Sequence, residues 1–299
     1  MREDEPESVH IYRCEITFWE HVFFSSREIS SFFQTEPLIG NYALAYALGL
    51  ARSPYHVEAD ANGRQRVSYK DDLLPLNERG VYVTPATIMG APRFALSQFN
   101  AQADAYWYAF TQNAIVVKQD DQEAEYDGQS WYVMTPATGR RSRTRPANFP
   151  QHGRIKMLAS GNQAVAYLLT RESIESVLPN YRLPRYIRLG KWMSKAAVDV
   201  SLQRCEPIWQ EEVSVEGFLN PVDLPDPAAL RVFDLVSIHP VPLVRNTRMR
   251  GWFYRAPDGA WLPARMRFGV DRLPDSRQGE SDKSSSRRRG RRSPPNIEG

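Results

Sequence analysis

The chain has 299 residues, of which 42% are hydrophobic and 24% are charged, and its formal net charge is +3. These totals are ordinary for a globular protein with a sizeable core, whereas 22 prolines and seven tryptophans argue against a helical bundle. No apolar run is long enough to span a membrane, and the distant Cys14 and Cys205 argue against a zinc site or a disulfide scaffold. We therefore expect a soluble, cytoplasmic protein without membrane contact.

The first elements that the sequence predicts are a long strand and a helix. An acidic leader, residues 1–8, precedes residues 9–19, whose alternation indicates a strand with one face made of Ile11, Arg13, Glu15, Thr17 and Trp19. Residues 41–52 have apolar side chains at helical spacing; Asn41 can cap the start, and Ser53-Pro54 stops the continuation. We expect this helix to belong to the core.

The middle of the chain predicts loops and short strands. Residues 55–80 indicate a loop and an edge strand around the Asn62-Gly63 turn, and residues 81–89 indicate a strand. Residues 120–128 indicate an acidic loop. Residues 135–156 are basic, contain proline and have few apolar side chains, so we expect an exposed loop or the tip of a long hairpin.

Strands dominate the rest of the predicted domain. Residues 154–169 indicate a hairpin that turns at Ser160-Gly161-Asn162, and a helix is predicted over 171–178. Residues 181–217 indicate paired strands. Two further strand-like pieces flank the Asp258-Gly259 turn, namely 251–255 and 260–266.

These elements predict a strand-rich α+β fold that forms one body, residues 9–272, with a projecting basic hairpin or loop near 135–156. The stretch DSRQGESDKSSSRRRGRRSPPN has no hydrophobic residue that could anchor it. We therefore expect residues 273–299 to be a disordered, Arg-rich tail.

The charge is unevenly distributed along the chain. Residues 140–195 carry twelve Arg or Lys and two acids, a net charge of +10, and residues 245–272 carry a net charge of +5. Between them, residues 196–244 have a net charge of −6. Segregation of this kind makes strong local fields without a high overall charge. The basic blocks suit a polyanion, and the acidic block suits a basic neighbour.

Enzyme signatures are absent from the sequence. It has no GxxxxGK[ST], GxGxxG or GxSxG motif, and its five histidines are scattered, with none at metal-ligand spacing from another. A metal-free ribonuclease needs only one well-placed general base, commonly histidine, and His152 lies inside the basic region. We predict no catalytic residue, no metal and no cofactor, with ribonuclease activity left as an alternative.

The strongest functional signal is RYIRLGKWMSKAAV, residues 185–198, in which cations alternate with aromatic side chains. In an extended conformation Tyr186, Arg188 and Trp192 share one face, and Gly190 leaves room for close approach. Arginine and lysine pair with phosphates, while an aromatic ring can stack on an unpaired base. In the alternative, the aromatics face the core, and we expect at least one of them to do so. The candidate RNA-binding residues are Arg185, Tyr186, Arg188, Lys191, Trp192 and Lys195.

Five stretches are characteristic strings of one family: TEPLIGNYALAYALGL, FNAQADAYW, NFPQHGRIKML, YIRLGKWMSKA and HPVPLV. They resemble the type I-D CRISPR effector subunit that caps the 5′ handle of the guide RNA, a member of the RAMP superfamily. The resemblance implies a ferredoxin-like (RRM-like) RAMP core with an elaborated β-hairpin. In that family a separate ribonuclease usually matures the guide, but in a related subtype the capping subunit itself cuts.

The resemblance also implies partners. The subunit would sit at the foot of a Cascade complex, hold the crRNA 5′ handle, contact the backbone subunit and the large subunit, and lie near the PAM-proximal target DNA. Segment 185–198 would then face the guide RNA or the protein groove that holds it. The basic loop would be a projecting thumb that touches the nucleic-acid backbone through Arg140, Arg141, Arg143 and Arg145.

Three functions remain open at this point. The first is a non-catalytic RNA-binding subunit of a type I-D CRISPR interference complex. The second is a metal-independent endoribonuclease that processes precursor crRNA. The third is a structural assembly protein whose basic blocks bind acidic protein partners.

Overall fold

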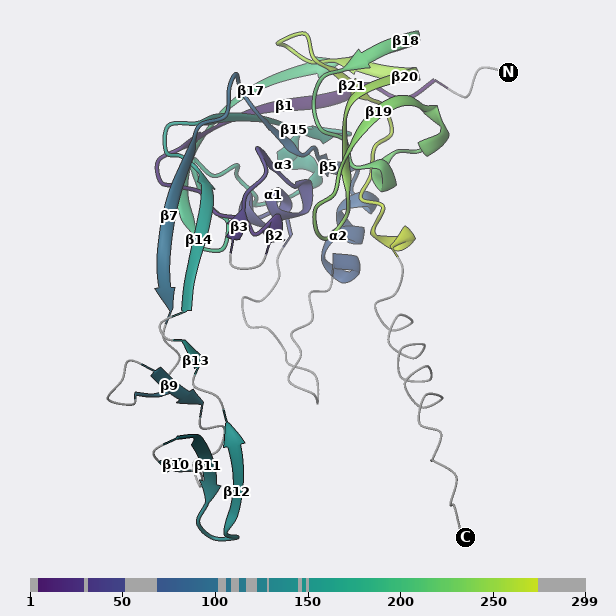
Figure 1. Ribbon diagram of the computed structural model, residues 1–299. Coiled ribbons are helices and arrows are strands. Elements are labelled where there is room, and N and C mark those ends of the chain that lie inside the picture. Colours follow the sequence, from purple (N-terminus) through teal and green to yellow (C-terminus); the bar gives the residue numbers. More distant parts are fainter. Residues whose placement is uncertain are drawn as a thin grey trace, which may run out of the picture.

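The computed structural model describes residues 5–29, 32–51, 69–101, 106–108, 113–116, 123–127, 129–144, 147–148 and 151–273. Its central sheet has seven strands: β1 (Val9–Phe18), β4 (Leu38–Ile39), β5 (Val81–Val83), β6 (Ala86–Ile88), β15 (Gln163–Thr170), β16 (Tyr186–Leu189) and β17 (Ser194–Cys205). Their order is β16-β17-β1-β15-β6-β4, and β5 also pairs with β15 (Figure 1). Every pair in this sheet is antiparallel.

The alternation of β1 decides which face of this sheet is core. The side chains on its inner face are buried, namely Tyr12, Cys14, Ile16 and Phe18. Cross-strand partners share a face of a sheet, so Ala166 opposite Cys14 and Val198 opposite Ile16 are buried as well. The face predicted for Ile11, Arg13, Glu15, Thr17 and Trp19 is not uniform in exposure: Ile11 is fully buried, Arg13, Glu15 and Thr17 are partly buried, and Trp19 is exposed.

Three α-helices cover the inner face: α1 (Asn41–Ala47), α2 (Tyr69–Glu78) and α3 (Ile174–Val177). In Figure 1 they lie below the long strands. Leu44, Leu73 and Ile174, one from each helix, are buried in the same hydrophobic cluster as β1 and β15. Among the helices of the described ranges, none has the length and apolarity needed to cross a membrane.

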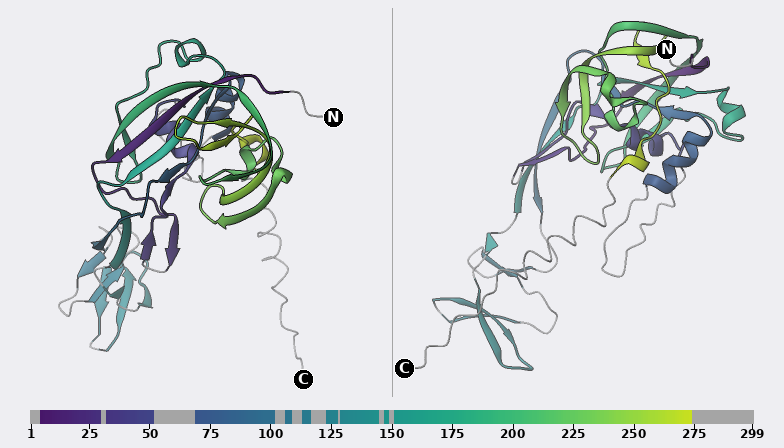
Figure 2. Two further views of the ribbon diagram at one scale, coloured as in Figure 1. Left: turned by 90° about the horizontal axis from the view of Figure 1, so that it is seen from above. Right: turned by 90° about the vertical axis from the view of Figure 1, so that its right-hand side faces the viewer.

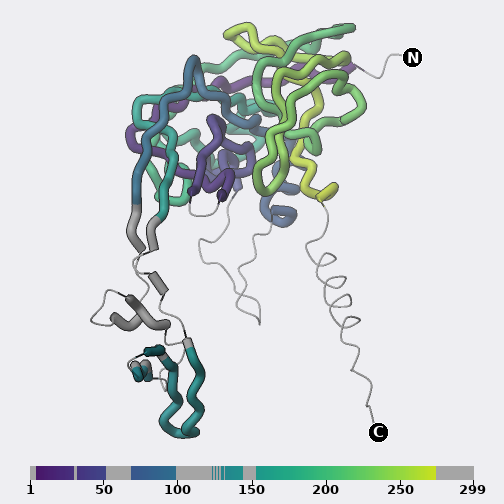
Figure 3. Tube along the Cα trace, viewed as in Figure 1, coloured from purple at the N-terminus to yellow at the C-terminus, as the bar shows by residue number. Residues whose placement is uncertain are grey.

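A second antiparallel sheet contains β18 (Pro207–Val215), β19 (Leu230–Val236), β20 (Leu243–Arg255) and β21 (Trp261–Pro263). β20 pairs with each of the other three strands. Only Glu206 separates β17 from β18, so the chain passes directly from one sheet into the other. Three short 3-10 helices follow in this part of the chain: η1 (Pro221–Asp223), η2 (Pro227–Ala229) and η3 (Val270–Arg272). Figure 3 shows the purple β1 beside the green and yellow strands of this sheet.

A two-stranded arm leaves the body, formed by β7 (Phe94–Ala101) and β14 (Gln151–Leu158) (Figures 1 and 2). At its base β2 (Arg27–Ile29) and β3 (Phe32–Gln34) extend its sheet, with β3 parallel to β14. The segment of the chain that connects β7 to β14 contains two three-stranded sheets. The first consists of β8 (Tyr106–Tyr108), β9 (Asn113–Val116) and β13 (Ala147–Asn148). The second consists of β10 (Glu123–Tyr126), β11 (Trp131–Thr135) and β12 (Arg140–Thr144).

A buried carboxylate joins α1 to the second half of the chain. Asp223, the last residue of η1, is fully buried and accepts hydrogen bonds from Asn41 Nδ2 at 2.6 Å, the Tyr82 hydroxyl at 3.0 Å and the Gly269 N–H at 2.7 Å. These donors come from α1, β5 and the segment before η3. Burial raises the pKa of the Asp223 carboxyl to about 6, and the hydrogen bonds oppose that shift because they favour the ionised form.

A second polar contact of this kind lies on the outer face of the central sheet. Asp258, in the turn between β20 and β21, pairs with Arg13 Nε at 2.8 Å and accepts a hydrogen bond from the Tyr167 hydroxyl at 2.6 Å. Arg13 and Tyr167 are cross-strand partners on β1 and β15. The part of the chain after β18 is therefore bonded to the central sheet at two separate places, through Asp223 to Tyr82 and through Asp258 to Arg13 and Tyr167.

The helices differ from the prediction. α1 ends at Ala47 instead of residue 52, and its N-cap is Gly40, because the Asn41 side chain bonds to Asp223 and not to the helix terminus. α3 covers only four residues of the predicted 171–178. α2 contradicts the loop and edge strand predicted for 55–80: burial of Leu73 and Leu76 outweighs the helix-breaking tendency of Pro75. The predicted Asn62-Gly63 turn lies outside the described residues.

Some strand predictions are also corrected. Residues 81–89 form two strands, because Pro85 between them has no N–H to donate to the ladder. The acidic stretch 120–128, expected as a loop, contains β10. The pairing predicted over 154–169 is wrong: β14 and β15 meet at the expected turn but belong to different sheets. The paired strands in 181–217 and around Asp258-Gly259 are confirmed.

We predict that Asp223 makes the protein more stable at pH 5 than at pH 7. Its pKa of about 6 exceeds the usual 3.8, so between these values the folded chain binds more protons than the unfolded chain, and stability is lost as the pH rises. The test measures the free energy of unfolding of wild type and of Asp223→Asn by urea denaturation at pH 5 and at pH 7. The stability advantage of wild type over the variant should be about 1 kcal/mol larger at pH 5 than at pH 7. An equal difference at both pH values would contradict this.

Candidate nucleic-acid interface

Residues 185–198 form a hairpin and not one extended strand. β16 and β17 pair directly, with Arg188 opposite Lys195 and Tyr186 opposite Ala197. Residues 190–193 make the turn between them, in which Gly190 and Met193 have positive φ. The predicted single face of Tyr186, Arg188 and Trp192 is therefore wrong, because Trp192 lies in the turn.

The space that Gly190 leaves is filled by the protein itself. A Cβ at Gly190 would clash with the carbonyl oxygen of Phe23, and its φ of +72° is unfavourable for other residues. The same Phe23 carbonyl accepts the Lys191 N–H at 2.8 Å. The glycine thus lets the turn lie against the loop after β1, which corrects the expectation that it admits a ligand.

The side chains of the hairpin separate by face. Ile187 and Leu189 are buried in the core, whereas Arg185 and Arg188 are exposed. Tyr186 is 52% exposed and Trp192 51% exposed, although Trp192 touches the ring of Phe23 with centroids 5.3 Å apart. The expectation that one of the two aromatics would be core is therefore wrong.

One acidic residue contacts both strands of this hairpin. Glu20 Oε2 accepts the Lys195 backbone N–H at 2.7 Å and lies 3.8 Å from Arg188 Nη1. Arg188 Nη1 also donates to the Met193 carbonyl at 3.1 Å. The Lys195 ammonium lies 4.5 Å from the ring centroid of Tyr186 and 4.6 Å from that of Trp19. The hairpin therefore holds its charges in defined places.

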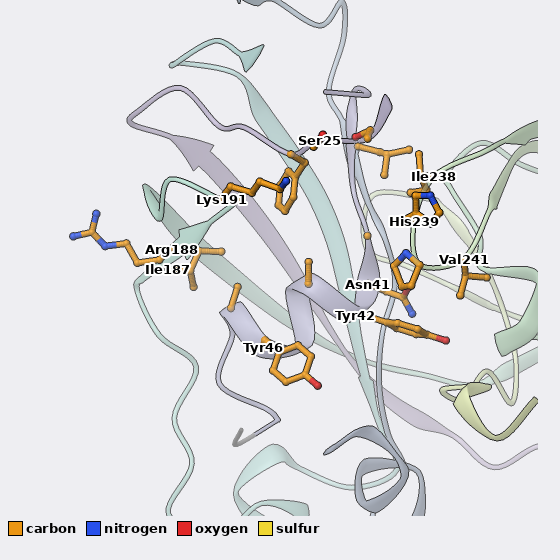
Figure 4. A pocket seen from close by; sticks show the side chains of 18 of the residues that line it. Ser25, Asn41, Tyr42, Tyr46, Ile187, Arg188, Lys191, Ile238, His239 and Val241 are labelled. Carbon is orange, nitrogen blue, oxygen red and sulfur yellow. The ribbon is translucent and has the colours of Figure 1, made fainter. Parts of the chain in front are cut away.

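A cavity of about 1060 Å³ opens beside the hairpin. Figure 4 shows its walls, which come from the loop before β2, from α1, from the hairpin and from the loop after β19. Lys191 lies along one wall, while Arg188 points away from the cavity at its edge (Figure 4). Four parts of the sequence that are remote from one another thus meet at one site.

The lining of the cavity combines cations with aromatic and apolar groups. Among the described residues it includes Arg188, Lys191 and Lys195 but no aspartate or glutamate. Tyr42 and Tyr46 line it from α1, and burial raises the pKa of both hydroxyls. The Tyr46 hydroxyl donates to Asp72 at 2.7 Å and the Tyr42 hydroxyl to Asp223 at 3.5 Å, so the two tyrosines offer the cavity their rings. This arrangement suits an anionic ligand that also has an apolar or aromatic part.

The sequence does not mark several residues of this site. It predicts that helix 41–52 belongs to the core, yet Asn41, Tyr42 and Tyr46 line the cavity (Figure 4). His239 and its neighbours reach the site from the second sheet. The only signal in the sequence was that both segments lie within the family-characteristic strings TEPLIGNYALAYALGL and HPVPLV.

Comparison with known families identifies the chain. Residues 9–271 match the family model described as "Type I-D CRISPR-associated protein Cas5/Csc1". The chain belongs to this family. The resemblance seen in the sequence is thereby confirmed, and no curated protein matches the chain.

Two solved structures are similar to this Cas5/Csc1-family chain. One is the "Cryo-EM structure of the Type III-B Cmr-beta bound to cognate target RNA and AMPPnP, state 1", with 10% identity, a TM-score of 0.33, and coverage of 80% of this chain and 86% of that chain. The other is a "Type IV-B CRISPR Complex", with 12% identity, a TM-score of 0.24, and coverage of 64% and 90%. Both TM-scores are below 0.5, so neither likeness establishes fold or function.

The predicted thumb residues are not brought to the cavity. Arg140, Arg141 and Arg143 are exposed on β12, which Figure 1 places at the far end of the arm from the body. Arg141 pairs with Glu125 at 3.1 Å and lies 3.8 Å from the ring centroid of Tyr132. Arg145 lies outside the described residues. The described arginines of β12 and the cations of the hairpin therefore do not lie at one site.

Candidate catalytic and metal-binding groups are sparse in the described part of the Cas5/Csc1-family chain. The described residues contain no cluster of three or more His, Cys, Asp or Glu that could hold a metal ion. His152 lies on β14, and its side chain is outside the description. His239 is the histidine that lines the cavity in the described ranges.

We predict that Gly190→Ala destabilises the protein more than Gly49→Ala does. Both glycines have a φ near +70°, but only at Gly190 would the new methyl group meet backbone atoms, while nothing lies within 4 Å at Gly49. The conformational cost, about 1–2 kcal/mol, is common to both, and the clash should add about 1–3 kcal/mol at Gly190. Urea denaturation measures the difference, and equal losses would show that the turn moves freely away from Phe23.

Proposed function

We propose that the protein is a non-catalytic RNA-binding subunit of a type I-D CRISPR interference complex. In this proposal it holds the crRNA 5′ handle next to the PAM-proximal end of the target, and it works in the cytoplasm. The observation that carries the proposal is the cavity lining, which has three cations and no acid among its described residues. Family membership supports the CRISPR setting.

The chemistry of the cavity favours a single strand over a duplex. Unpaired nucleotides offer both phosphates for Arg188 and Lys191 and bases that can enter a partly apolar hollow lined by tyrosines. A duplex hides its bases and leaves mainly phosphate contacts. An RNA handle that lies outside a duplex therefore uses both kinds of group present at this site.

The arm and the central sheet extend the proposal. The exposed arginines of β12 would contact the nucleic-acid backbone, as a thumb that projects from the body would do. We further propose a ferredoxin-like RAMP core, which the antiparallel order β17-β1-β15 followed by β5 and β6 supports. In the complex the protein would contact the backbone subunit and the large subunit, close to the PAM-proximal DNA.

A metal-independent endoribonuclease is the second candidate, and one observation favours it. His239 lines the same cavity as Lys191. A neutral histidine can take the proton of a ribose 2′-hydroxyl as that oxygen attacks the adjacent phosphorus and the 5′-oxygen leaves, and a nearby ammonium can stabilise the charge on the phosphate. The third candidate, an assembly protein, has only the unequal charge of the chain in its favour.

We predict that Arg188→Ala with Lys191→Ala weakens binding of single-stranded handle RNA by the full-length protein. Two lost phosphate contacts should make the slope of log K against log salt shallower by about 1.4. Stability should change by no more than about 0.5 kcal/mol, because both side chains are exposed. Fluorescence anisotropy over a range of salt concentrations measures the slope.

A matched control is Arg204→Ala with Arg231→Ala. This double variant removes the same charge from exposed positions in the acidic block 196–244 and should leave the slope unchanged. Equal slopes for the two double variants would mean that the hairpin cations do not contact RNA. Absence of salt-dependent RNA binding by wild type would favour the assembly protein.

We also predict that the purified protein does not cleave repeat-containing RNA in the presence of a chelator. Among the described residues, His239 is the single histidine in the cavity lining, and no carboxyl group accompanies it there. Product analysis on a denaturing gel decides the matter. Cleavage that disappears in His239→Ala or His152→Ala would establish the ribonuclease in place of the non-catalytic subunit.

A further inference from the structure

An exposed aromatic pair stands beside the cavity on the outer face of the central sheet. Trp19, just after β1, and Tyr186, on β16, make an edge-to-face contact with ring centroids 5.1 Å apart. Trp19 is 49% exposed and Tyr186 52% exposed. Folding therefore leaves about half of each large ring in contact with water, although rings of this size gain most when they are buried.

The backbone around this pair is firmly held. The Trp19 N–H donates to the Lys195 carbonyl at 3.0 Å, and the Lys195 N–H donates to Glu20 Oε2 at 2.7 Å. The Ser194 hydroxyl donates to the His21 carbonyl at 2.6 Å. These bonds join the end of β1 to the start of β17. Because the backbone on both sides of the pair is already fixed, a ligand that stacks on the rings causes little loss of conformational entropy in this segment.

The charge at the pair suits an anionic aromatic ligand. The Lys195 ammonium lies within 4.6 Å of both ring centroids. Its backbone N–H engages Glu20, which also lies 3.8 Å from Arg188, so the nearby carboxylate already has partners. A cation between two aromatic rings can meet the phosphate of a nucleotide whose base stacks on one of the rings.

The pair is continuous with the cavity. Tyr186 and Lys195 belong to both, and Arg188 stands between them on the same face of β16 and β17. Trp192 is equally exposed but lies in the turn, packed against Phe23, and does not contact this pair of rings. A strand whose phosphates bind at Arg188 and Lys191 therefore has the Trp19–Tyr186 pair next along its path.

We propose that Trp19 and Tyr186 form a stacking site for one unpaired base of the guide RNA, with Lys195 on the phosphate of that nucleotide. This inference rests on the proposed function and adds to it a residue, Trp19, that lies more than 160 positions from the basic hairpin in the sequence. Trp192 is not part of the stacking site.

The test compares Trp19→Leu with Trp19→Phe in the full-length protein. Both keep an apolar side chain at this half-exposed position, but only phenylalanine keeps a ring that can stack. The probes are a labelled oligouridine and its abasic counterpart, which has the same phosphates and no bases. Thermal melting followed by circular dichroism verifies that both variants are folded.

We expect Trp19→Leu to bind oligouridine about 5- to 100-fold more weakly than wild type, with an unchanged salt slope, because stacking releases no counterions. Trp19→Phe should stay within a few-fold of wild type, and neither variant should alter binding of the abasic strand. Trp192→Ala is the control and should bind both probes as wild type does.

The outcomes separate this inference from the proposed function. Salt-dependent binding by wild type that is unchanged in Trp19→Leu overturns the stacking site and leaves the RNA-binding subunit standing. An equal loss on both probes also overturns it, because the tryptophan would then act without the base. No binding of either strand by wild type overturns the stacking site and the proposed function together.

Discussion

The buried carboxylate of Asp223 is the constraint on which the arrangement of the site depends. A fully buried carboxyl group needs hydrogen-bond donors from the protein, and here they come from α1, β5 and the segment before η3. Meeting that need fixes the start of α1 against η1. Asn41, Tyr42 and His239 all line the cavity, and Lys191 of the hairpin lies across from them (Figure 4). The hydrogen bonds that stabilise the buried Asp223 therefore also help to position the residues that line the cavity.

The β16–β17 hairpin supplies the charge that this cavity lacks elsewhere. Its tight turn lies against the Phe23 carbonyl, which only a glycine at position 190 permits. The turn sends Lys191 along the cavity wall, while β16 keeps Arg188 and Tyr186 on the outer face. Cavity, cations and the Trp19–Tyr186 pair therefore form one continuous surface around the edge of the central sheet.

The family assignment and the geometry answer different questions. Membership of the Cas5/Csc1 family gives the setting of the protein, a type I-D CRISPR system. The geometry gives a chemical preference, for a ligand that has negative charge and flat apolar groups. A single strand of RNA has both properties, which is why we propose it as the ligand.

The sequence by itself determined the features that depend on near neighbours. Alternation specified β1, the Asp258-Gly259 turn was visible, and the interleaved cations and aromatics of 185–198 marked the hairpin of the candidate site. Only the tertiary structure decided the rest. Asn41 donates to the distant carboxylate of Asp223 instead of capping its own helix. Burial of Leu73 and Leu76 stabilises a helix that contains Pro75. Trp19 contacts Tyr186, which lies 167 positions away in the sequence. The physical reason is that burial, and the pairing of groups far apart in the chain, outweigh local preferences of about 1 kcal/mol.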